Sequence, residues 1–77
     1  MNLFLYKHLD DVEALIIPQD LAAALKQNSQ AEQYFSAFSP SSKKGILQWI
    51  KMAKRETTRQ QRISKTVEMT AQNKKAI

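Results

Sequence analysis

Apolar residues recur at helical spacing along most of this chain, and few helix-breaking residues interrupt them. The 77 residues include one glycine and two prolines. From Trp49 to Met69, an apolar stripe and a cluster of Lys and Arg share about six helical turns. The sequence contains no sustained strand-like alternation and no Asn-Gly or Asp-Gly hairpin pair. We therefore predict an all-α fold, a compact bundle of three to four short helices with a basic C-terminal helix.

The length and composition limit both the number of domains and the cell compartment. A chain of this length has room for one small domain. Cysteine is absent, which excludes a disulfide or thiolate site and suits a reducing compartment. No apolar run reaches the roughly 18–20 residues that a membrane-spanning helix needs. The opening residues also lack the small-residue cleavage site of a signal peptide. We expect a cytoplasmic protein without a transmembrane segment.

The first 17 residues are predicted to be an N-terminal extension or linker, with a short helix as the alternative. A helical stripe fits four of their apolar residues, Leu5, Leu9, Val12 and Ile16. Pro18 favours extended chain instead, because it disfavours helical geometry at Ile17. We expect the helical domain to cover residues 18–73 and residues 74–77 to form a frayed tail.

Capping residues predict where the helices of this domain begin. Pro18 suits a first helical position, and Ser29 with Glu32 matches a capping box. Ser39-Pro40 combines an N-cap serine with a proline at the next position. Thr57 is the predicted cap of the last helix. These signals divide the domain into four short helical segments.

The predicted core lies on the inner faces of these segments. It consists of Leu21, Leu25, Ala31, Tyr34, Phe35, Phe38, Ile46, Trp49, Ile50, Ala53, Ile63 and Val67, with Leu47 at its edge. We interpret the aromatic residues as core rather than as a base-stacking platform. Gly45 costs its helix about 1 kcal/mol relative to alanine, and we expect it to permit the close approach of another helix.

Charge is distributed unevenly and predicts the candidate binding residues. Residues 33–77 carry ten Lys and Arg side chains against two acidic ones, whereas residues 1–32 carry five acidic side chains against two basic ones. This asymmetry suits either an anionic partner or docking of the two halves on each other, although basic helical faces are often simply solvated. The candidate surface for an anionic partner consists of Lys51, Lys54, Arg55, Arg59 and Arg62.

Two interpretations of Arg59 and Arg62 remain open. Because they lie one helical turn apart, their guanidinium groups suit a shared carboxylate or phosphate cluster. Alternatively, one or both pair with an acidic residue of this chain and join the last helix to the acidic half. The candidate acidic residues are Asp20, Glu32 and Glu68.

The residues that catalytic or cofactor sites require are scarce. His8 lies beside Asp10 and Asp11, but their spacing matches no established metal site. A single glycine excludes a P-loop and a dinucleotide-binding fingerprint. Ser39, Ser41 and Ser42 look like caps and loop residues. We therefore expect no catalytic, cofactor-binding or metal-ligating residue and a non-enzymatic protein.

The order of several short motifs resembles the bacteriocin-protection family, also called YdeI/OmpD-associated. The matching pieces are Pro18–Leu25, Phe35–Pro40, Trp49-Ile50, Ala53–Arg55, Thr58-Arg59, Arg62-Ile63 and Val67–Met69. One departure is Glu56-Thr57, where the family usually shows Pro and then Glu. The resemblance implies a small bacterial helical domain, often at the C-terminal end of a longer chain, with a link to bacteriocin tolerance and the cell envelope. It transfers no catalytic residues.

The leading functional hypothesis is a small interaction module that binds an unidentified protein or another anionic partner. The alternative is a nucleic-acid-binding domain, because two helices around Ser39-Pro40 loosely resemble a helix-turn-helix and the isoelectric point is about 9.8. Ile46, Trp49 and Ile50 argue against it, since they suit a core better than a base-reading face. Association with a membrane surface ranks last, because the last helix lacks an apolar Trp, Phe and Leu face.

Overall fold

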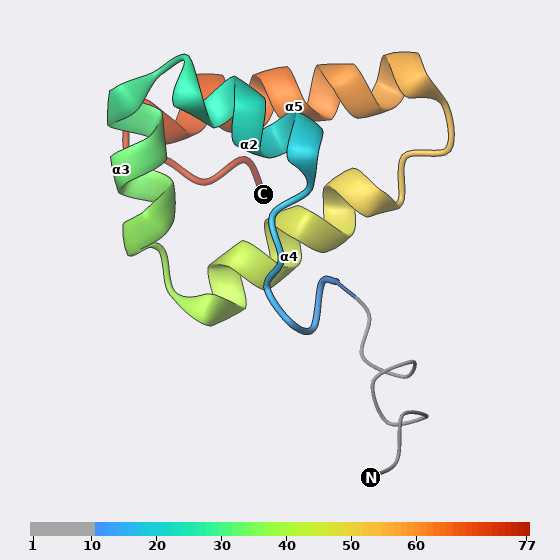
Figure 1. Cartoon of the computed structure of the whole chain (residues 1–77), viewed down its shortest axis with the longest axis horizontal. Helices are drawn as coiled ribbons and strands as arrows, with labels where there is room; N and C mark the ends of the chain where they lie inside the picture. The colour runs from blue at the N-terminus through green and yellow to red at the C-terminus, as the bar shows by residue number, and fades with distance from the viewer. Residues whose placement is uncertain (1–10) are drawn as a thin grey trace, which may run out of the picture.

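The computed structural model describes residues 11–77, and this part of the chain is all-α (Figure 1). Its four helices are α2 (Gln19–Lys26), α3 (Ser29–Ala37), α4 (Pro40–Lys51) and α5 (Glu56–Thr70). Between residues 11 and 77 no residue lies in a strand, and none of the helices is long and apolar enough to cross a membrane. The predicted fold class is confirmed. Leu5, His8, Leu9 and Asp10, which were part of the predictions, lie outside the described residues.

The longest helix, α5, is the centre of the bundle. It contacts each of the other three helices, and α2 also contacts α3. In Figure 1, α2 runs beside α5 while α4 crosses the molecule below them. Because α2, α3 and α4 all pack against α5, residues in the segments between the helices are positioned relative to α5.

The core is close to the predicted one. The buried apolar cluster consists of Val12, Leu21, Leu25, Ala31, Phe35, Ile46, Leu47, Ile50 and Ile63. Trp49, Phe38 and Val67 are only partly buried and pack against this cluster. Leu47, which was predicted at the edge, is 2% exposed. Val12, from the segment before α2, belongs to the same buried cluster and lines the same cavity as Leu47.

Two of the predicted N-caps are wrong by one or two residues. The N-cap of α3 is Asn28 rather than Ser29, and the Asn28 side-chain oxygen accepts the N–H of Ala31 at 3.0 Å. The helix α5 begins at Glu56, so Thr57 lies within its first turn instead of capping it. Asparagine and serine are almost equally good N-caps, so the local sequence did not decide between neighbours.

The predicted start of α4 is confirmed, whereas α2 begins one residue after Pro18, which was predicted as its first residue and is its N-cap. Ser39 caps α4, and its hydroxyl oxygen accepts the N–H of Ser42 at 3.2 Å, with Pro40 as the first helical residue. Pro18 stands directly before α2, and its carbonyl accepts the N–H of Ala22 at 2.9 Å. Both prolines lie where a missing backbone N–H leaves no helical hydrogen bond unmade.

The segment before α2 begins with a tight turn over residues 11–15. The N–H of Ile16 bonds to the carbonyl of Asp11 at 2.9 Å, and the N–H of Leu15 bonds to that of Val12 at 3.0 Å. Leu15 has a φ of 57°, in the left-handed region that leucine rarely adopts. This pair of hydrogen bonds is the pattern that ends helices, so the chain turns here and then extends into α2. Residues 11–17 therefore contain a turn and no helix.

The chain end beyond α5 folds back on the bundle. The same hydrogen-bond pattern closes α5 around Asn73, which has a φ of 59°. Residues 74–77 are not helical. The ammonium group of Lys75 lies 5.8 Å from the centre of the Phe38 ring, and Ile77 lies near Gly45 of α4. The last residues thus have contacts with α4 and with the residue that ends α3.

Replacing Gly45 by alanine should stabilise the protein. The predicted close approach of another helix at Gly45 is not found. A methyl group there would meet the side-chain Cδ1 atom of Ile77 at 3.6 Å, which is ordinary van der Waals contact. Alanine removes the helix penalty of glycine, so we expect the free energy of unfolding to rise by about 0.5–1 kcal/mol. Thermal melting followed by circular dichroism should show an increase of roughly 2–8 °C.

Deleting Ile77 in both backgrounds is the control for this substitution. The gain from alanine should persist without Ile77, because the methyl group fits beside that side chain. A gain that arises only after the deletion would show that the tail crowds position 45.

Candidate functional site

The five predicted binding residues all lie around the link between α4 and α5. Lys51 is the last residue of α4, Lys54 and Arg55 belong to the link, and Arg59 and Arg62 lie on α5. The first three side chains are exposed, whereas the two on α5 are half-buried. The fold therefore divides the predicted set into two groups with different surroundings.

Arg59 forms an ion pair with Asp20 of α2. Its Nε and Nη2 atoms donate to the two carboxylate oxygens at 2.6 and 3.0 Å. The side chains are 24% and 34% exposed, so the pair is partly shielded from water. The hydrogen bonds from Arg59 lower the pKa of Asp20, and those to Asp20 raise the pKa of Arg59. The interpretation that an arginine of α5 pairs with an acidic residue of the N-terminal half is confirmed for Arg59.

Arg62 is held by Trp49 rather than by an acidic side chain. Its Nη1 atom donates to the backbone carbonyl of Trp49 at 2.6 Å, and its guanidinium carbon lies 5.1 Å from the centre of the indole ring. The carbonyl of Trp49 belongs to the last turn of α4, where carbonyls have no helical donor. Arg62 thus satisfies that carbonyl, stacks on the ring and joins α5 to α4.

Lys54 and Arg55 have different surroundings. Within residues 11–77, neither side chain forms a hydrogen bond or an ion pair. Arg55 is the N-cap of α5 but makes no side-chain cap hydrogen bond. Both cations stand at the positive end of the α5 dipole, where positive charge destabilises a helix. No contact within residues 11–77 therefore explains why these two positions carry exposed positive charges.

A small cavity adjoins this link. It has a volume of about 160 Å³. Its apolar lining comes from Val12, Ile16, Pro18 and Leu47. Its polar lining comes from Asp11, Lys51 and Arg59. Lys51 and Arg59 come from the two helices that residues 52–55 connect, so the cavity lies between the end of α4, the first turns of α5 and the segment before α2.

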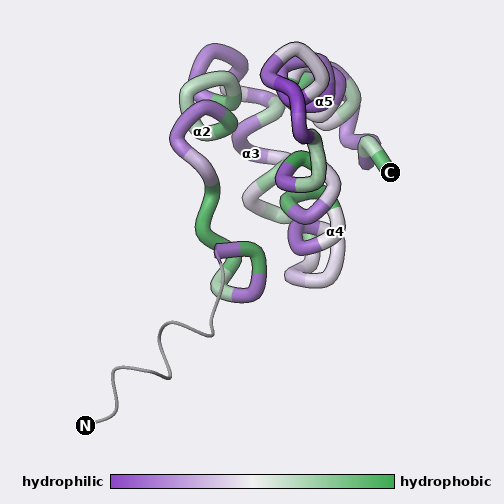
Figure 2. Tube along the Cα trace, turned by 90° about the vertical axis from the view of Figure 1, so that its right-hand side faces the viewer, coloured by the Kyte–Doolittle hydropathy of each residue, from purple (hydrophilic) through white to green (hydrophobic). Residues whose placement is uncertain are grey.

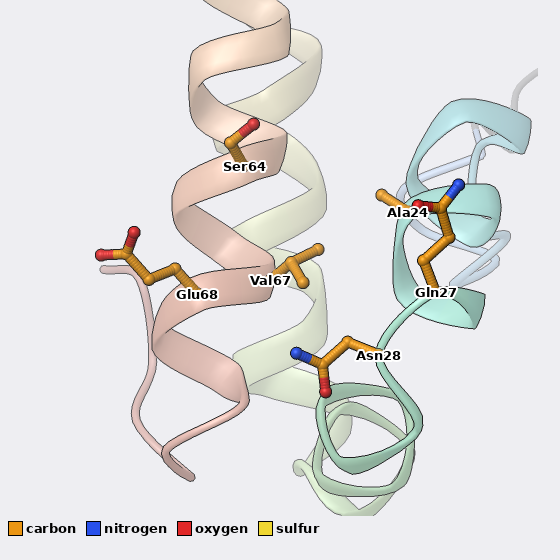
Figure 3. A pocket seen from close by; sticks show the side chains of 6 residues that line it. All are labelled: Ala24, Gln27, Asn28, Ser64, Val67 and Glu68. Atoms are coloured by element: carbon orange, nitrogen blue, oxygen red, sulfur yellow. The ribbon is translucent and has the colours of Figure 1, made fainter.

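A wider hollow between α2 and α5 differs in chemistry (Figure 3). It has a volume of about 450 Å³ and is lined by Ala24, Gln27, Asn28, Ser64, Val67 and Glu68. Figure 3 shows Val67 directed toward α2 and Glu68 on the other side of α5. None of its lining residues is basic, and Asn28 is engaged in capping α3. This hollow does not suit an anionic ligand.

The part of the chain from residue 11 onward contains no group of three His, Asp or Glu residues that could hold a metal ion. Its polar side chains instead serve as caps or structural partners, as Asn28, Ser39, Asp20 and Arg62 do. The link with its two exposed cations, together with the cavity beside it, is therefore the candidate site.

Comparison with protein-family models gives a match over residues 14–73, to the OmdA family, described as bacteriocin-protection, YdeI or OmpD-associated. The chain belongs to this family. The matched range contains all four helices and the whole α4–α5 link. Comparisons with curated proteins and with solved structures found no significant match. The family resemblance expected from the motifs is confirmed.

Proposed function

We propose that this member of the OmdA family is a small, non-enzymatic interaction module that acts in bacteriocin protection and binds an anionic partner. The contacts come from Lys51, Lys54 and Arg55, around the link between α4 and α5. The family description supplies the link to bacteriocin protection. The lack of cysteine fits action in the reducing cytoplasm.

The position of Lys54 and Arg55 is the observation that carries this proposal. Two adjacent cations at the start of a helix weaken it, and α5 has no side-chain cap there to compensate. Residues that destabilise the local structure and make no compensating contact are expected at functional sites. An anionic partner would neutralise both charges and interact favourably with the helix end.

Arg59 and Arg62 have a supporting role in this proposal. Both guanidinium groups are bound within the fold, one by Asp20 and the other by Trp49. They fix the start of α5 against α2 and against the end of α4. The link between these fixed points then presents its cations in a defined place, which lowers the entropic cost of binding.

Exchange of the link cations for acids tests the proposal. We expect Lys54→Glu with Arg55→Glu to weaken binding of a labelled Asp- and Glu-rich peptide by roughly five- to tenfold at low salt, since rim charges each contribute modestly. Fluorescence anisotropy measures the affinity. The variant should melt at or above the wild-type temperature, because acidic residues suit the start of α5.

The matched control places the same charge change elsewhere on the surface. Lys65→Glu with Lys74→Glu alters two exposed lysines, one on α5 and one beyond it. This variant should retain most of the wild-type affinity for the peptide. Equal losses in the two variants would indicate attraction by net charge and would contradict a site at the link.

The nucleic-acid alternative is an outcome of the same titration. In a helix-turn-helix, α4 would read the bases, but its Ile46, Leu47 and Ile50 are buried and its Lys44 pairs with Glu13 at 2.9 Å. We expect duplex and single-stranded DNA to bind more weakly than the acidic peptide. Salt-dependent binding of DNA that is tighter than binding of the peptide would replace the proposal.

A challenge of living cells with a bacteriocin tests the biological part. Sensitive cells that express the wild-type chain should survive better than cells that express the Lys54→Glu, Arg55→Glu variant at the same level. Equal survival of the two cell types would show that Lys54 and Arg55 are not needed for bacteriocin protection.

A further inference from the structure

The cavity beside the link has the size of one apolar side chain. Its volume is about 160 Å³, and a cavity of about 150 Å³ with apolar walls accommodates a benzene molecule. Val12 and Leu47, both buried, form part of its wall. The space suits a phenyl ring or a branched aliphatic side chain.

Exposed apolar residues mark the side from which this cavity is reached. Ile16 lines the cavity and is nevertheless 53% exposed. Ile17 follows it and is 38% exposed. Figure 2 shows this stretch as a hydrophobic piece of chain between the turn and α2. Exposed isoleucines beside a partly apolar cavity form a surface whose burial by a partner would stabilise the complex.

The backbone around this wall is held in an uncommon conformation. Leu15 adopts its φ of 57° directly before Ile16, and two hydrogen bonds of the turn keep it there. Such conformations persist where the surrounding structure enforces them, and they concentrate at binding sites. The turn places Val12 inside the cavity wall and Ile16 at its rim.

The polar part of the wall connects the cavity to the proposed binding link. Lys51 and Arg59 line the cavity from the two helices that the link joins. Asp20 accepts hydrogen bonds from the Nε and Nη2 atoms of Arg59 and neutralises it, so Arg59 adds no net charge to the wall. Asp11 is the one acidic residue of the lining. Lys54 and Arg55 do not line the cavity but follow Lys51 by three and four residues along the chain, within reach of a bound peptide segment.

We propose that the anionic partner is an acidic protein segment that inserts one apolar side chain into this cavity. Carboxylates on either side of that side chain pair with Lys54 and Arg55. The inference rests on the proposed function and deepens it, because it names the class of partner. A nucleic acid has no apolar side chain to place in the cavity, so the site favours protein over polyanions in general.

Two labelled peptides that differ at one position test this inference. Each has Asp and Glu residues on both sides of a central residue, which is Phe in one peptide and Ser in the other. We expect the wild-type protein to bind the Phe peptide about tenfold more tightly, as partial burial of a phenyl ring implies. Fluorescence anisotropy at fixed salt gives both dissociation constants.

Substitutions in the protein locate the effect. Ile16→Ser removes an exposed part of the cavity wall and should cancel most of the preference for the Phe peptide. Ile17→Ser is the matched control, because Ile17 is its exposed neighbour and does not line the cavity. Lys54→Glu with Arg55→Glu should raise the dissociation constants of both peptides by the same factor and leave the ratio of the two constants unchanged.

The outcomes separate this inference from the proposed function. Equal binding of the two peptides by the wild-type protein would overturn the cavity proposal and leave the link as a binding site. Failure of both peptides to bind would overturn the proposed function as well. A wild-type dimer in sedimentation that Ile16→Ser dissociates would overturn the inference, because a second copy of this chain would then occupy the cavity.

Discussion

Replacing Phe35 by alanine should remove a large part of the stability of the protein. Within residues 11–77, Phe35 is the largest fully buried side chain, with 1% of its surface exposed. Removal of such a ring costs about 3–5 kcal/mol. A domain of 77 residues has a total stability of roughly 4–12 kcal/mol, so the loss takes a large part of it. Circular dichroism at 222 nm during urea unfolding measures the change.

Phe38→Ala is the matched control for Phe35→Ala. The two rings belong to one pair, with centres 5.9 Å apart and planes at 57°, but Phe38 is only half-buried. We expect a loss of about 1 kcal/mol, from partial burial and the ring pair. Equal losses in the two variants would show that the core is not centred on Phe35.

Helical periodicity was sufficient to predict most of this core. Leu21, Phe35, Ile46 and Ile63 lie on the buried faces that their spacing indicated. Prediction worked because each helix is amphipathic and a chain this short has one core to which all of those faces can turn. The fold class follows from the same pattern.

The details that the sequence did not predict depend on contacts between distant segments. Arg62 binds a backbone carbonyl of Trp49, and a carbonyl acceptor has no signature in the sequence. Leu47 shares the buried cluster with Val12, which belongs to the segment that was predicted as an extension or linker. The cavity is lined by residues of the segment before α2, of α4 and of α5, so periodicity within α4 gave no sign of it.

The pairing of Arg59 was one of two interpretations, and the sequence did not decide between them. A basic residue on a helix face has similar local neighbours whether it binds a partner or an acidic residue of its own chain. The decision comes from the packing of α2 against α5, which places Asp20 within hydrogen-bond distance of Arg59. The binding role proposed for the link therefore rests on Lys54 and Arg55, whose exposure the fold leaves unexplained.

Arg59→Met should destabilise the protein by about 2 kcal/mol. This value lies between the contribution of exposed ion pairs, up to about 1 kcal/mol, and the cost of breaking buried ones, about 3–5 kcal/mol, because the pair is partly exposed. Asp20→Asn should cost a similar amount, and the double variant should cost less than the sum. Urea unfolding of the four proteins gives the coupling energy.

The pH dependence of unfolding supplies an independent check on the same pair. Arg59 lowers the pKa of Asp20 below its ordinary value of 3.8, so the ionised carboxylate stabilises the folded state. This contribution is fully present above about pH 4 and declines as the pH falls through the lowered pKa of the folded state. Wild-type melting temperatures should therefore fall more steeply in acid than those of Asp20→Asn.

The two measurements together decide the role of Arg59. A double-variant loss smaller than the sum of the single losses, with a flatter acid profile in Asp20→Asn, identifies Arg59 as the residue that fixes α5 against α2. In that case Arg59→Met weakens peptide binding only as far as it loosens the start of α5, and the loss should be smaller than that from the link variant. An unchanged melting temperature of Arg59→Met with a large loss of peptide binding would instead show that Arg59 contacts the partner. The partner would then compete with Asp20 for the guanidinium group of Arg59.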